Sequence, residues 1–178
     1  MIRDYNSVHL ADSPAALFDV CGALEDCGVR QLVSEHFGER PLMTISKSSL
    51  RRLPYKEKTL SWHQEIAVFK NPGQRAINCW ISLSECGRDA PGLEILPMRV
   101  AEIERQGQGY GLASNLLETL ALDAAVVPLF EPGDALLFDD LLVHRTAMSE
   151  QMTKVRYSIE NWLFAPSAFG LAHDALVF

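Results

Sequence analysis

The amino-acid sequence predicts a mainly β domain of the sandwich or barrel type, preceded by packing helices. From residue 41 onward, short strand-like stretches recur, and Gly and Pro turns separate them. Before that point, apolar residues recur at helical spacing instead. The chain has 178 residues, of which 48% are hydrophobic, so it can bury a core of its own. We therefore expect residues 1–178 to form a single domain.

Two helices are expected before the β region. In residues 13–27, Ser13 is a plausible N-cap and Pro14 occupies the first helical position. Gly28 ends this helical pattern, and a second, shorter helix is expected over residues 29–37. Both segments have the apolar face of a helix that packs on a core. We interpret them as packing elements and not as part of a functional site.

Strand signals then continue almost to the end of the chain. They cover residues 41–50, 62–69, 76–83, 93–96, 126–130, 134–138, 141–147 and 155–164. The breaks between them contain the dipeptide Pro-Gly three times, which is turn chemistry. The last two strands flank a polar stretch at 149–153, and we expect them to form a hairpin.

One segment does not follow this rhythm of short strands. Residues 98–124 contain a cluster of glycines and then a stretch with helical spacing. Long connections in compact domains are often lids or binding loops, which is the role expected here. The tail after Pro166 is apolar and is expected to pack on the core.

Composition excludes several classes of partner. A formal net charge of −7 argues against nucleic acid, because phosphate binding requires a basic surface. No apolar run is long enough to span a membrane, and the first residues lack the apolar region of a signal peptide. The four cysteines form no CxxC pair, so we expect reduced thiols in a cytoplasmic protein.

The strongest chemical signal is the sequence Trp62-His63-Gln64-Glu65. Alternate residues of a strand point to the same face, so His63 and Glu65 can be directed at one point. His144, from a distant strand, would complete a two-histidine, one-carboxylate site of the kind found in non-haem Fe(II) oxygenases. Taken alone, H-x-E is weak evidence, because a solvated carboxylate beside a hydrogen-bonded histidine is more common.

The predicted hairpin adds an arginine to this site. If its strands pair symmetrically about Glu150, His144 and Arg156 are directly opposite and point to the same face. A guanidinium beside a metal ligand could hold a dicarboxylate whose other end chelates the metal. Thr146 lies two residues beyond His144, on the same face, and could donate its hydroxyl to the same carboxylate.

These residues together resemble the phytanoyl-CoA dioxygenase family of Fe(II)/2-oxoglutarate oxygenases. The segments that carry the resemblance are WHQE, INCWISLSECGRDAPGLEILP, FEPGDALLFDDLLVHRTA and RYSIENWLFAP. They occur in the order found in the family and extend from about Pro41 to Pro166. The resemblance implies a double-stranded β-helix, which is a jelly-roll barrel similar to that of cupins, with iron bound inside its open end.

The resemblance also assigns roles to individual residues. It implies that His63, Glu65 and His144 bind Fe(II). It implies that Arg156 holds the distal carboxylate of the cosubstrate 2-oxoglutarate, with Thr146 beside it. A sixth residue, Trp80, resembles the family tryptophan that lines the cosubstrate pocket. No separate catalytic acid or base is implied.

The implied activity is oxidation of a small organic substrate, usually by hydroxylation, with consumption of O₂ and release of succinate and CO₂. The family usually has Asp where this chain has Glu65, which is one methylene longer. The chain is also shorter than is usual for the family, which disfavours a large acyl-CoA substrate. The prime substrate, the exact oxidative outcome and the oligomeric state stay open.

Two alternatives remain at this point. A cupin-like barrel could use the same ligands for redox-neutral metal chemistry, although such a site would not need the arginine at position 156. A shortened barrel could instead bind a small acid or a protein partner without turnover. The complete set of three candidate ligands argues against the second alternative, and the length of the chain argues for it.

Overall fold

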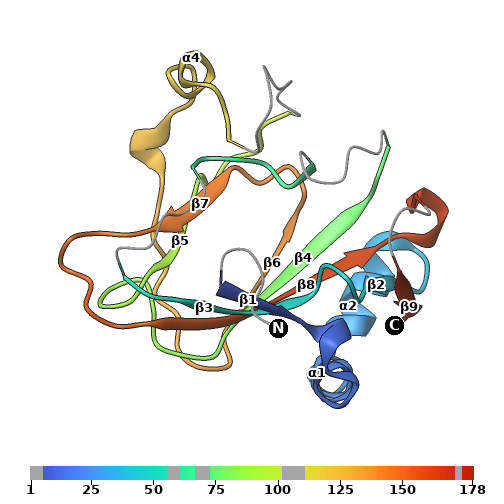
Figure 1. Ribbon diagram of the computed structural model, residues 1–178. Coiled ribbons are helices and arrows are strands. Elements are labelled where there is room, and N and C mark those ends of the chain that lie inside the picture. Colours follow the sequence, from blue (N-terminus) through green and yellow to red (C-terminus); the bar gives the residue numbers. More distant parts are fainter. Residues whose placement is uncertain (1–5, 56–60, 67–72, 102–110, 171–173) are drawn as a thin grey trace.

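The computed structural model describes residues 6–55, 61–66, 73–101, 111–170 and 174–178. Figure 1 shows how the helices and strands are arranged. The strands are β1 (Ser7–His9), β2 (Leu42–Thr44), β3 (Ser49–Leu53), β4 (Ala76–Ser82), β5 (Gly92–Ile95), β6 (Ala135–Asp139), β7 (His144–Ala147), β8 (Arg156–Phe164) and β9 (Ala175–Val177). The helices are α1 (Pro14–Asp26), α2 (Val29–Phe37) and the short α4 (Ser114–Leu117), with 3₁₀ turns at Leu10–Asp12, Leu122–Ala124 and Pro166–Ala168. None of the described helices is long and apolar enough to cross a membrane.

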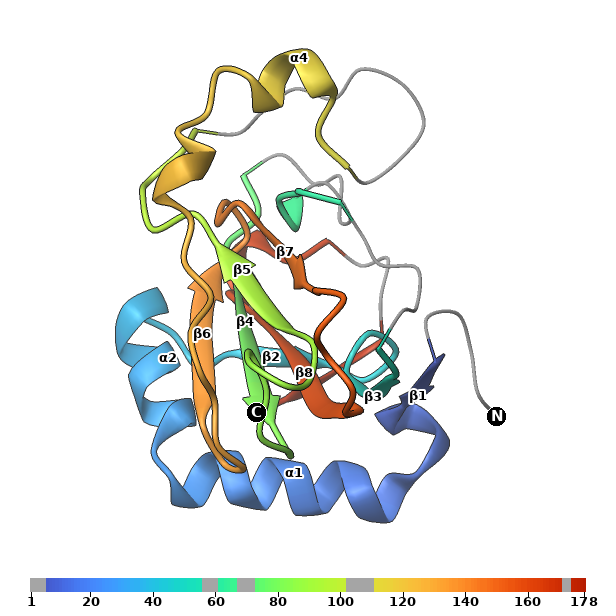
Figure 2. The same ribbon diagram turned by 90° about the vertical axis from the view of Figure 1, so that its left-hand side faces the viewer.

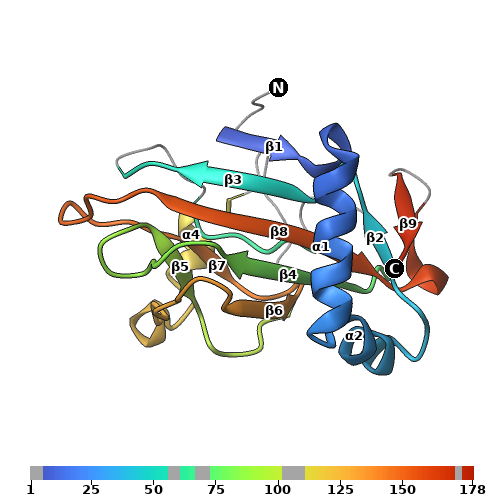
Figure 3. The same cartoon turned by 90° about the horizontal axis from the view of Figure 1, so that it is seen from below.

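The two expected helices are present, and glycines set the boundary between them. Gly28 has φ +80° and Gly38 has φ +75°, a left-handed conformation that glycine adopts at little cost. Pro14 begins α1 as predicted, whereas Ser13 occupies the N-cap position without a side-chain capping bond. In Figure 3, α1 crosses the outer face of the larger sheet. The helices thus cover that sheet.

The larger sheet is antiparallel and is centred on β8. This strand pairs with β2 and β3 along one edge and with β4 along the other, while β6 pairs with β4. Side chains of each strand alternate between the two faces. Ile77 and Cys79 of β4 join Leu163 of β8 in the core beneath the helices, while Trp80 packs in a second core on the other face.

The second face of the larger sheet, which we call the inner face, is directed at a two-stranded sheet made of β5 and β7. Trp80 and Phe138 from the larger sheet pack with Leu93 of β5 in one buried cluster. Figure 2 shows β5 and β7 on the side of the larger sheet opposite α1. Two antiparallel sheets, the larger one curled, confirm the predicted mainly β jelly-roll fold.

The predicted hairpin between β7 and β8 is wrong. β7 pairs with β5, and β8 pairs with strands of the larger sheet, so the connection crosses from one sheet to the other. The polar stretch 149–153 contains a turn, in which the N–H of Met152 donates to the carbonyl of Ser149 at 3.2 Å, but the strands on either side of it do not pair with each other. Met152 is buried, and the N–H groups of Thr153 and Lys154 both donate to the carbonyl of Asp89 at 2.9 Å. A distant loop therefore helps to hold this connection.

Three further expectations about secondary structure need correction or completion. Residues 62–66 are not a regular strand and form only an isolated bridge, and 67–69 lie outside the described residues. Residues 126–130 form single bridges at Val126 and Phe130 in place of a strand. Residues 41–50 contain β2 and the start of β3, separated by a turn.

The two long irregular segments also have defined positions. In the 98–124 segment, 102–110 lie outside the described residues, and the remainder after residue 110 packs on a buried cluster of Trp62, Leu96 and Val143. The described part therefore packs on this cluster, and the expected role as a lid or binding loop stays a prediction. The C-terminal tail packs down as expected, since β9 pairs with β2 and the side chain of Phe178 is buried.

Candidate metal centre

A short backbone bridge joins the two candidate histidine ligands. The N–H of His63 donates to the carbonyl of His144 at 3.0 Å, and the N–H of His144 donates to the carbonyl of His63 at 3.1 Å. Residues paired in this way point to the same face. Both side chains are buried, and their rings lie 4.3 Å apart between centroids.

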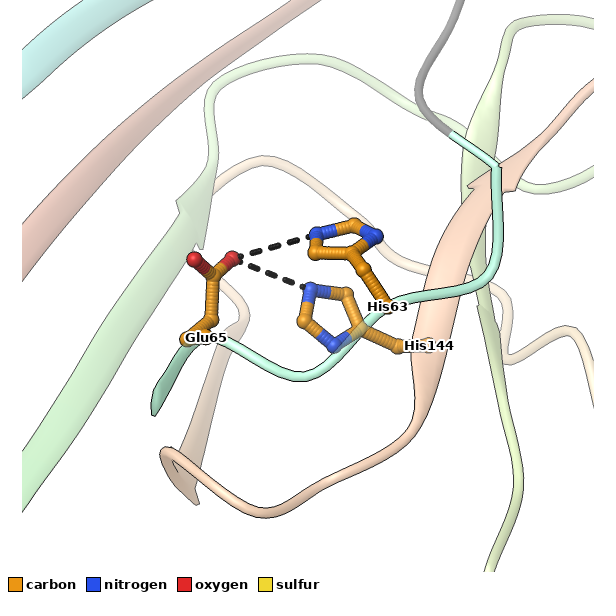
Figure 4. Close-up of side chains that lie close together, drawn as sticks. All are labelled: His63, Glu65 and His144. Carbon is orange, nitrogen blue, oxygen red and sulfur yellow. Dashed lines mark ion pairs between the residues drawn. The ribbon is translucent and has the colours of Figure 1, made fainter. Parts of the chain in front are cut away.

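Glu65 completes the group, as Figure 4 shows. Its Oε1 lies 3.3 Å from Nε2 of His63 and 3.3 Å from Nε2 of His144. One donor atom from each of the three residues falls within 4.8 Å of the others, which is close enough to hold a metal ion. The structure thus brings together the three residues predicted as metal ligands.

The outer nitrogen of each imidazole has a backbone acceptor. Nδ1 of His63 lies 2.8 Å from the carbonyl of Ser61, and Nδ1 of His144 lies 3.0 Å from the carbonyl of Leu142. When Nδ1 carries the proton and donates it, the Nε2 lone pair is free to bind a metal. Two imidazole nitrogens and one carboxylate suit a borderline ion such as Fe(II), so the residues fit the metal that the sequence implies.

The three groups influence one another's protonation. Burial alone would raise the pKa of Glu65, but hydrogen bonds and the charges of His144 and His63 lower it well below its usual range. Burial lowers the pKa of His63, and the adjacent Glu65 more than reverses this, so the pKa of His63 is raised. A positive charge on this imidazole and a negative charge on the carboxylate therefore stabilise each other.

Two residues adjacent to the ligands in sequence, Gln64 and Arg145, make contacts on the side away from the candidate metal centre. The sequence did not predict these contacts. Gln64 is buried, and its Nε2 donates to the carbonyls of Leu141 at 2.8 Å and Ala101 at 3.1 Å. This amide ties the segment that carries His63 to the loop that leads into β7. Side-chain alternation already predicted that Gln64 faces away from the metal, but a buried crosslink requires the tertiary structure.

Arg145 makes the second contact of this kind. Its guanidinium lies 4.7 Å from the centre of the Trp62 ring, and its Nε donates to Glu94 on the neighbouring strand at 2.5 Å. Trp62 precedes one histidine ligand and Arg145 follows the other. Their stacking therefore reinforces the histidine bridge from the opposite face.

The predicted clamp residue Arg156 is buried on the inner face, with 2% of its surface exposed. It is not opposite His144, as the sequence suggested, but opposite Leu53 of β3. Its Nη1 donates to the carbonyl of Gly92 at 3.0 Å, and its Nε has no partner among the described residues. Burial lowers the pKa of Arg156 to about 10, so the guanidinium stays charged at neutral pH.

The remaining predicted residues lie near this arginine. The Trp80 ring is 5.5 Å from the guanidinium carbon of Arg156. Thr146 is half-buried and lies opposite Leu93, next to the glycine whose carbonyl Arg156 binds. That glycine, Gly92, allows close approach of two chain segments, because a Cβ there would meet Cα of Gly87 at 2.7 Å.

Sequence reasoning also missed three polar residues of the inner face. Ser158 is fully buried, and its hydroxyl has no partner in the part of the chain that the structure describes. Asn78 and Glu160 contact each other on the same face. Spacing by two from Arg156 would have identified Ser158 and Glu160, because alternate residues of one strand share a face.

Comparison with known proteins gives a family and a fold. Residues 2–153 match the family model described as phytanoyl-CoA dioxygenase. No curated protein sequence matches the chain. EctD from S. alaskensis, crystallised with 2-oxoglutarate and 5-hydroxyectoine, has a TM-score of 0.73 and 19% identity, with 91% of this chain and 57% of EctD covered.

Two other solved structures have the same fold. For ThoJ, a non-heme monooxygenase in apo form, the TM-score is 0.67 and the identity 19%, with 84% of this chain and 56% of ThoJ covered. SnoN is an epimerase whose structure was solved in complex with Fe³⁺, alpha ketoglutarate and nogalamycin RO. Its TM-score is 0.59 and its identity 13%, with 76% of this chain and 54% of SnoN covered. The chain thus spans little more than half the length of these structures, and at such identities the likeness shows the fold alone.

Removing one ligand should abolish stoichiometric metal binding without unfolding the protein. His144→Ala leaves the backbone bridge intact but removes one of three donors, so anaerobic Fe(II) titration should show no tight site. His36→Ala, which changes an exposed histidine, is the matched control and should bind like wild type. Tight iron binding by His144→Ala would mean that this histidine is not a ligand.

Metal binding should weaken as the pH falls. A metal needs neutral His63, and Glu65 raises the pKa of this imidazole above its ordinary value of 6.5. Protons therefore compete before the usual histidine range is reached, and affinity should fall about tenfold per pH unit for each proton displaced. Co(II) titrations from about pH 8 to about pH 5.5 measure this. A pH-independent affinity would argue against His63 as a ligand.

Proposed function

This chain belongs to the phytanoyl-CoA dioxygenase family, as its sequence motifs indicated, and on that basis we propose that it is an Fe(II)- and 2-oxoglutarate-dependent dioxygenase. One observation carries the proposal: a compact group of two histidines and one carboxylate shares the barrel interior with a buried arginine whose Nε has no partner among the described residues. We propose that residues 1–178 form a single jelly-roll domain. A small organic molecule is the proposed prime substrate.

In this proposal His63, Glu65 and His144 hold Fe(II). Three donor atoms fill only part of the coordination sphere of Fe(II), so positions would be left for other molecules. Bound iron, with 2-oxoglutarate and O₂, would supply an oxidative decarboxylation that releases succinate and CO₂ and oxidises the substrate, with hydroxylation as the proposed outcome. The protein groups bind and orient the reactants, and none is needed as a separate acid or base.

The buried arginine supports 2-oxoglutarate as the cosubstrate. A buried guanidinium is costly when its donors are unsatisfied, and among the described residues Arg156 donates to a neutral carbonyl while its Nε has no partner. A carboxylate could accept two parallel bonds from a guanidinium. Ser158, two residues along the same face, has a buried hydroxyl without a described partner and could donate to the same group. Thr146 is proposed as a further donor.

Apolar surface between these polar groups would strengthen their contacts. Phe138 lies 4.9 Å from the His144 ring, and Trp80 packs beside Arg156. Exclusion of water lowers the local dielectric, which strengthens the pairing of a carboxylate with a guanidinium. Trp80 is accordingly proposed as the wall of the cosubstrate site.

The two alternatives are less well supported. Redox-neutral metal chemistry gives no reason to bury an arginine whose Nε has no described partner in the same barrel interior. Binding without turnover gives no reason to direct three donor atoms at one point. The oxidative outcome is a proposal, since the structural neighbours include both a monooxygenase and an epimerase.

Succinate formation from 2-oxoglutarate tests the proposal without knowledge of the prime substrate. Purified protein with Fe(II) and 2-oxoglutarate under air should form succinate slowly, through uncoupled turnover. Glu65→Gln keeps the shape of the side chain but removes its charge, so succinate formation should fall close to zero. Glu118→Gln, at an exposed carboxylate, is the control and should retain wild-type turnover.

Two results would refute the proposal. One is a wild-type protein that binds iron but forms no succinate with any addition tested. The other is equal succinate formation by wild type and Glu65→Gln, which would remove this carboxylate from the metal site.

Loss of the arginine should act on the cosubstrate alone. Arg156→Ala should weaken 2-oxoglutarate binding by about 2–5 kcal/mol, as for truncation of one partner in a buried charge pair. Affinity for Fe(II) without 2-oxoglutarate should change little. Calorimetry under nitrogen measures both, with Arg52→Ala on the exposed face of β3 as control. Unchanged 2-oxoglutarate affinity would show that the cosubstrate binds elsewhere.

A further inference from the structure

A carboxylate lies on the inner face of the barrel and has no role in the proposed chemistry. Glu160 is in the middle of β8, opposite Trp80 of β4 and Ser49 of β3. It shares its face with Arg156, four residues earlier on the strand. Its side chain is 12% exposed, so it is largely desolvated but not fully buried.

Two weak contacts hold this carboxylate. Nη1 of Arg51 lies 3.4 Å from one oxygen of Glu160, and Nδ2 of Asn78 donates to the other at 3.3 Å. Charge-assisted hydrogen bonds are usually about 2.7–2.9 Å long. A carboxylate can accept about four bonds. Glu160 therefore keeps the capacity to bind a further donor at close range.

Asn78 supplies a second acceptor next to this carboxylate. The side chain of Asn78 is fully buried, and because its Nδ2 donates to Glu160, its Oδ1 is directed elsewhere. That oxygen has no donor among the residues that the structure describes. A buried carbonyl oxygen without a donor costs free energy, so a ligand that supplies one would remove that cost.

This pair of acceptors lies close to the candidate metal centre. Asn78 is opposite Phe138 of β6, whose ring contacts the ring of His144. Glu160 lies on β8, which is two strands away from β6 in the sheet, so two strand spacings of about 5 Å separate it from β6 by about 10 Å. It lies on the same face of β8 as Arg156, so the acceptors lie on the face that also carries the proposed cosubstrate clamp. A substrate held there would have a neighbouring atom near the metal.

Aromatic surface on the same face suits a cation. Trp80 is opposite Glu160, and Trp162 is opposite Asn78, each across the β4–β8 pair. Indole faces attract ammonium groups, and more strongly when water is excluded. The negative charge of Glu160 favours a positively charged donor over a neutral hydroxyl group.

We propose that Glu160 and Asn78 bind an ammonium group of the prime substrate, which makes that substrate a small amine or amino acid. That the bound amine is the substrate rests on the proposed dioxygenase function, whereas the existence of an ammonium-binding site does not. Glu160 is a specificity-determining residue in this proposal. Its alternative role is an internal ion pair with Arg51 that stabilises the sheet and binds nothing.

Calorimetry separates the two roles. The probes are a series of aliphatic diamines and α-amino acids, each tested beside its N-acetyl derivative, on protein loaded with Mn(II) and 2-oxoglutarate under nitrogen. At least one amine should bind wild type, and acetylation should weaken it by about tenfold to hundredfold, as expected for loss of a hydrogen bond to a charged group. Glu160→Gln should weaken the same amine by a similar factor. Glu118→Gln is the control.

Three outcomes would overturn the inference. The first is that no amine binds wild type, and the second is that each amine binds as tightly as its N-acetyl derivative. The third is that Glu160→Gln leaves the amine affinity unchanged and lowers only the melting temperature. If Glu160→Gln does not fold, Asn78→Ala replaces it, because it removes the second acceptor and must also weaken the amine.

Succinate formation by wild type is measured in parallel, so that the two proposals can fail separately. Amine binding that depends on Glu160 without any succinate would refute the dioxygenase and leave the amine site standing. Succinate formation without amine binding would refute the amine site and leave the dioxygenase standing.

Discussion

The candidate metal centre depends on the backbone bridge between His63 and His144. Two reciprocal hydrogen bonds join segments that are far apart in the chain. They place both imidazole side chains on the same face of the bridge. Backbone carbonyls then orient each ring through Nδ1, and Glu65 reaches both Nε2 atoms without lying on a regular strand. Gln64 and Arg145 hold the same bridge from the other side. The geometry of the three ligands therefore depends on the packing of residues 61–66 against β7.

The inner face of the barrel is less stable than an apolar face would be. Arg156 is buried with an unpaired Nε, and Ser158 and Asn78 each bury an oxygen without a described partner. Each such group costs free energy in the protein alone. Several of them on one face, next to a group of metal-binding residues, are expected where a polar ligand completes the hydrogen bonds. This is the physical reason for placing both the cosubstrate and the substrate on this face.

Much of the fold was predictable, and the errors have a common cause. The helices ending at Gly28 and Gly38 and the strands β4, β6 and β8 agree with local signals of turn chemistry and periodicity. The predicted hairpin was wrong because it assumed that neighbouring strands pair with each other. The connection of eight residues between β7 and β8 is long enough to cross between sheets, and two of its N–H groups bind the carbonyl of Asp89. Sequence patterns describe a strand but not its partner.

The sequence by itself determined which residues could take part: a histidine two positions from a carboxylate, a second histidine, an arginine, and family motifs in a recognisable order. It also determined that Arg156, Ser158 and Glu160 share one face of their strand, because side-chain alternation is a local property of an extended chain. Only the tertiary structure decided that β7 pairs with β5, that Arg156 binds the carbonyl of Gly92, and that Glu160 contacts Asn78. These contacts join residues distant in sequence, and they follow from the way the sheets pair and curl, which no local pattern encodes.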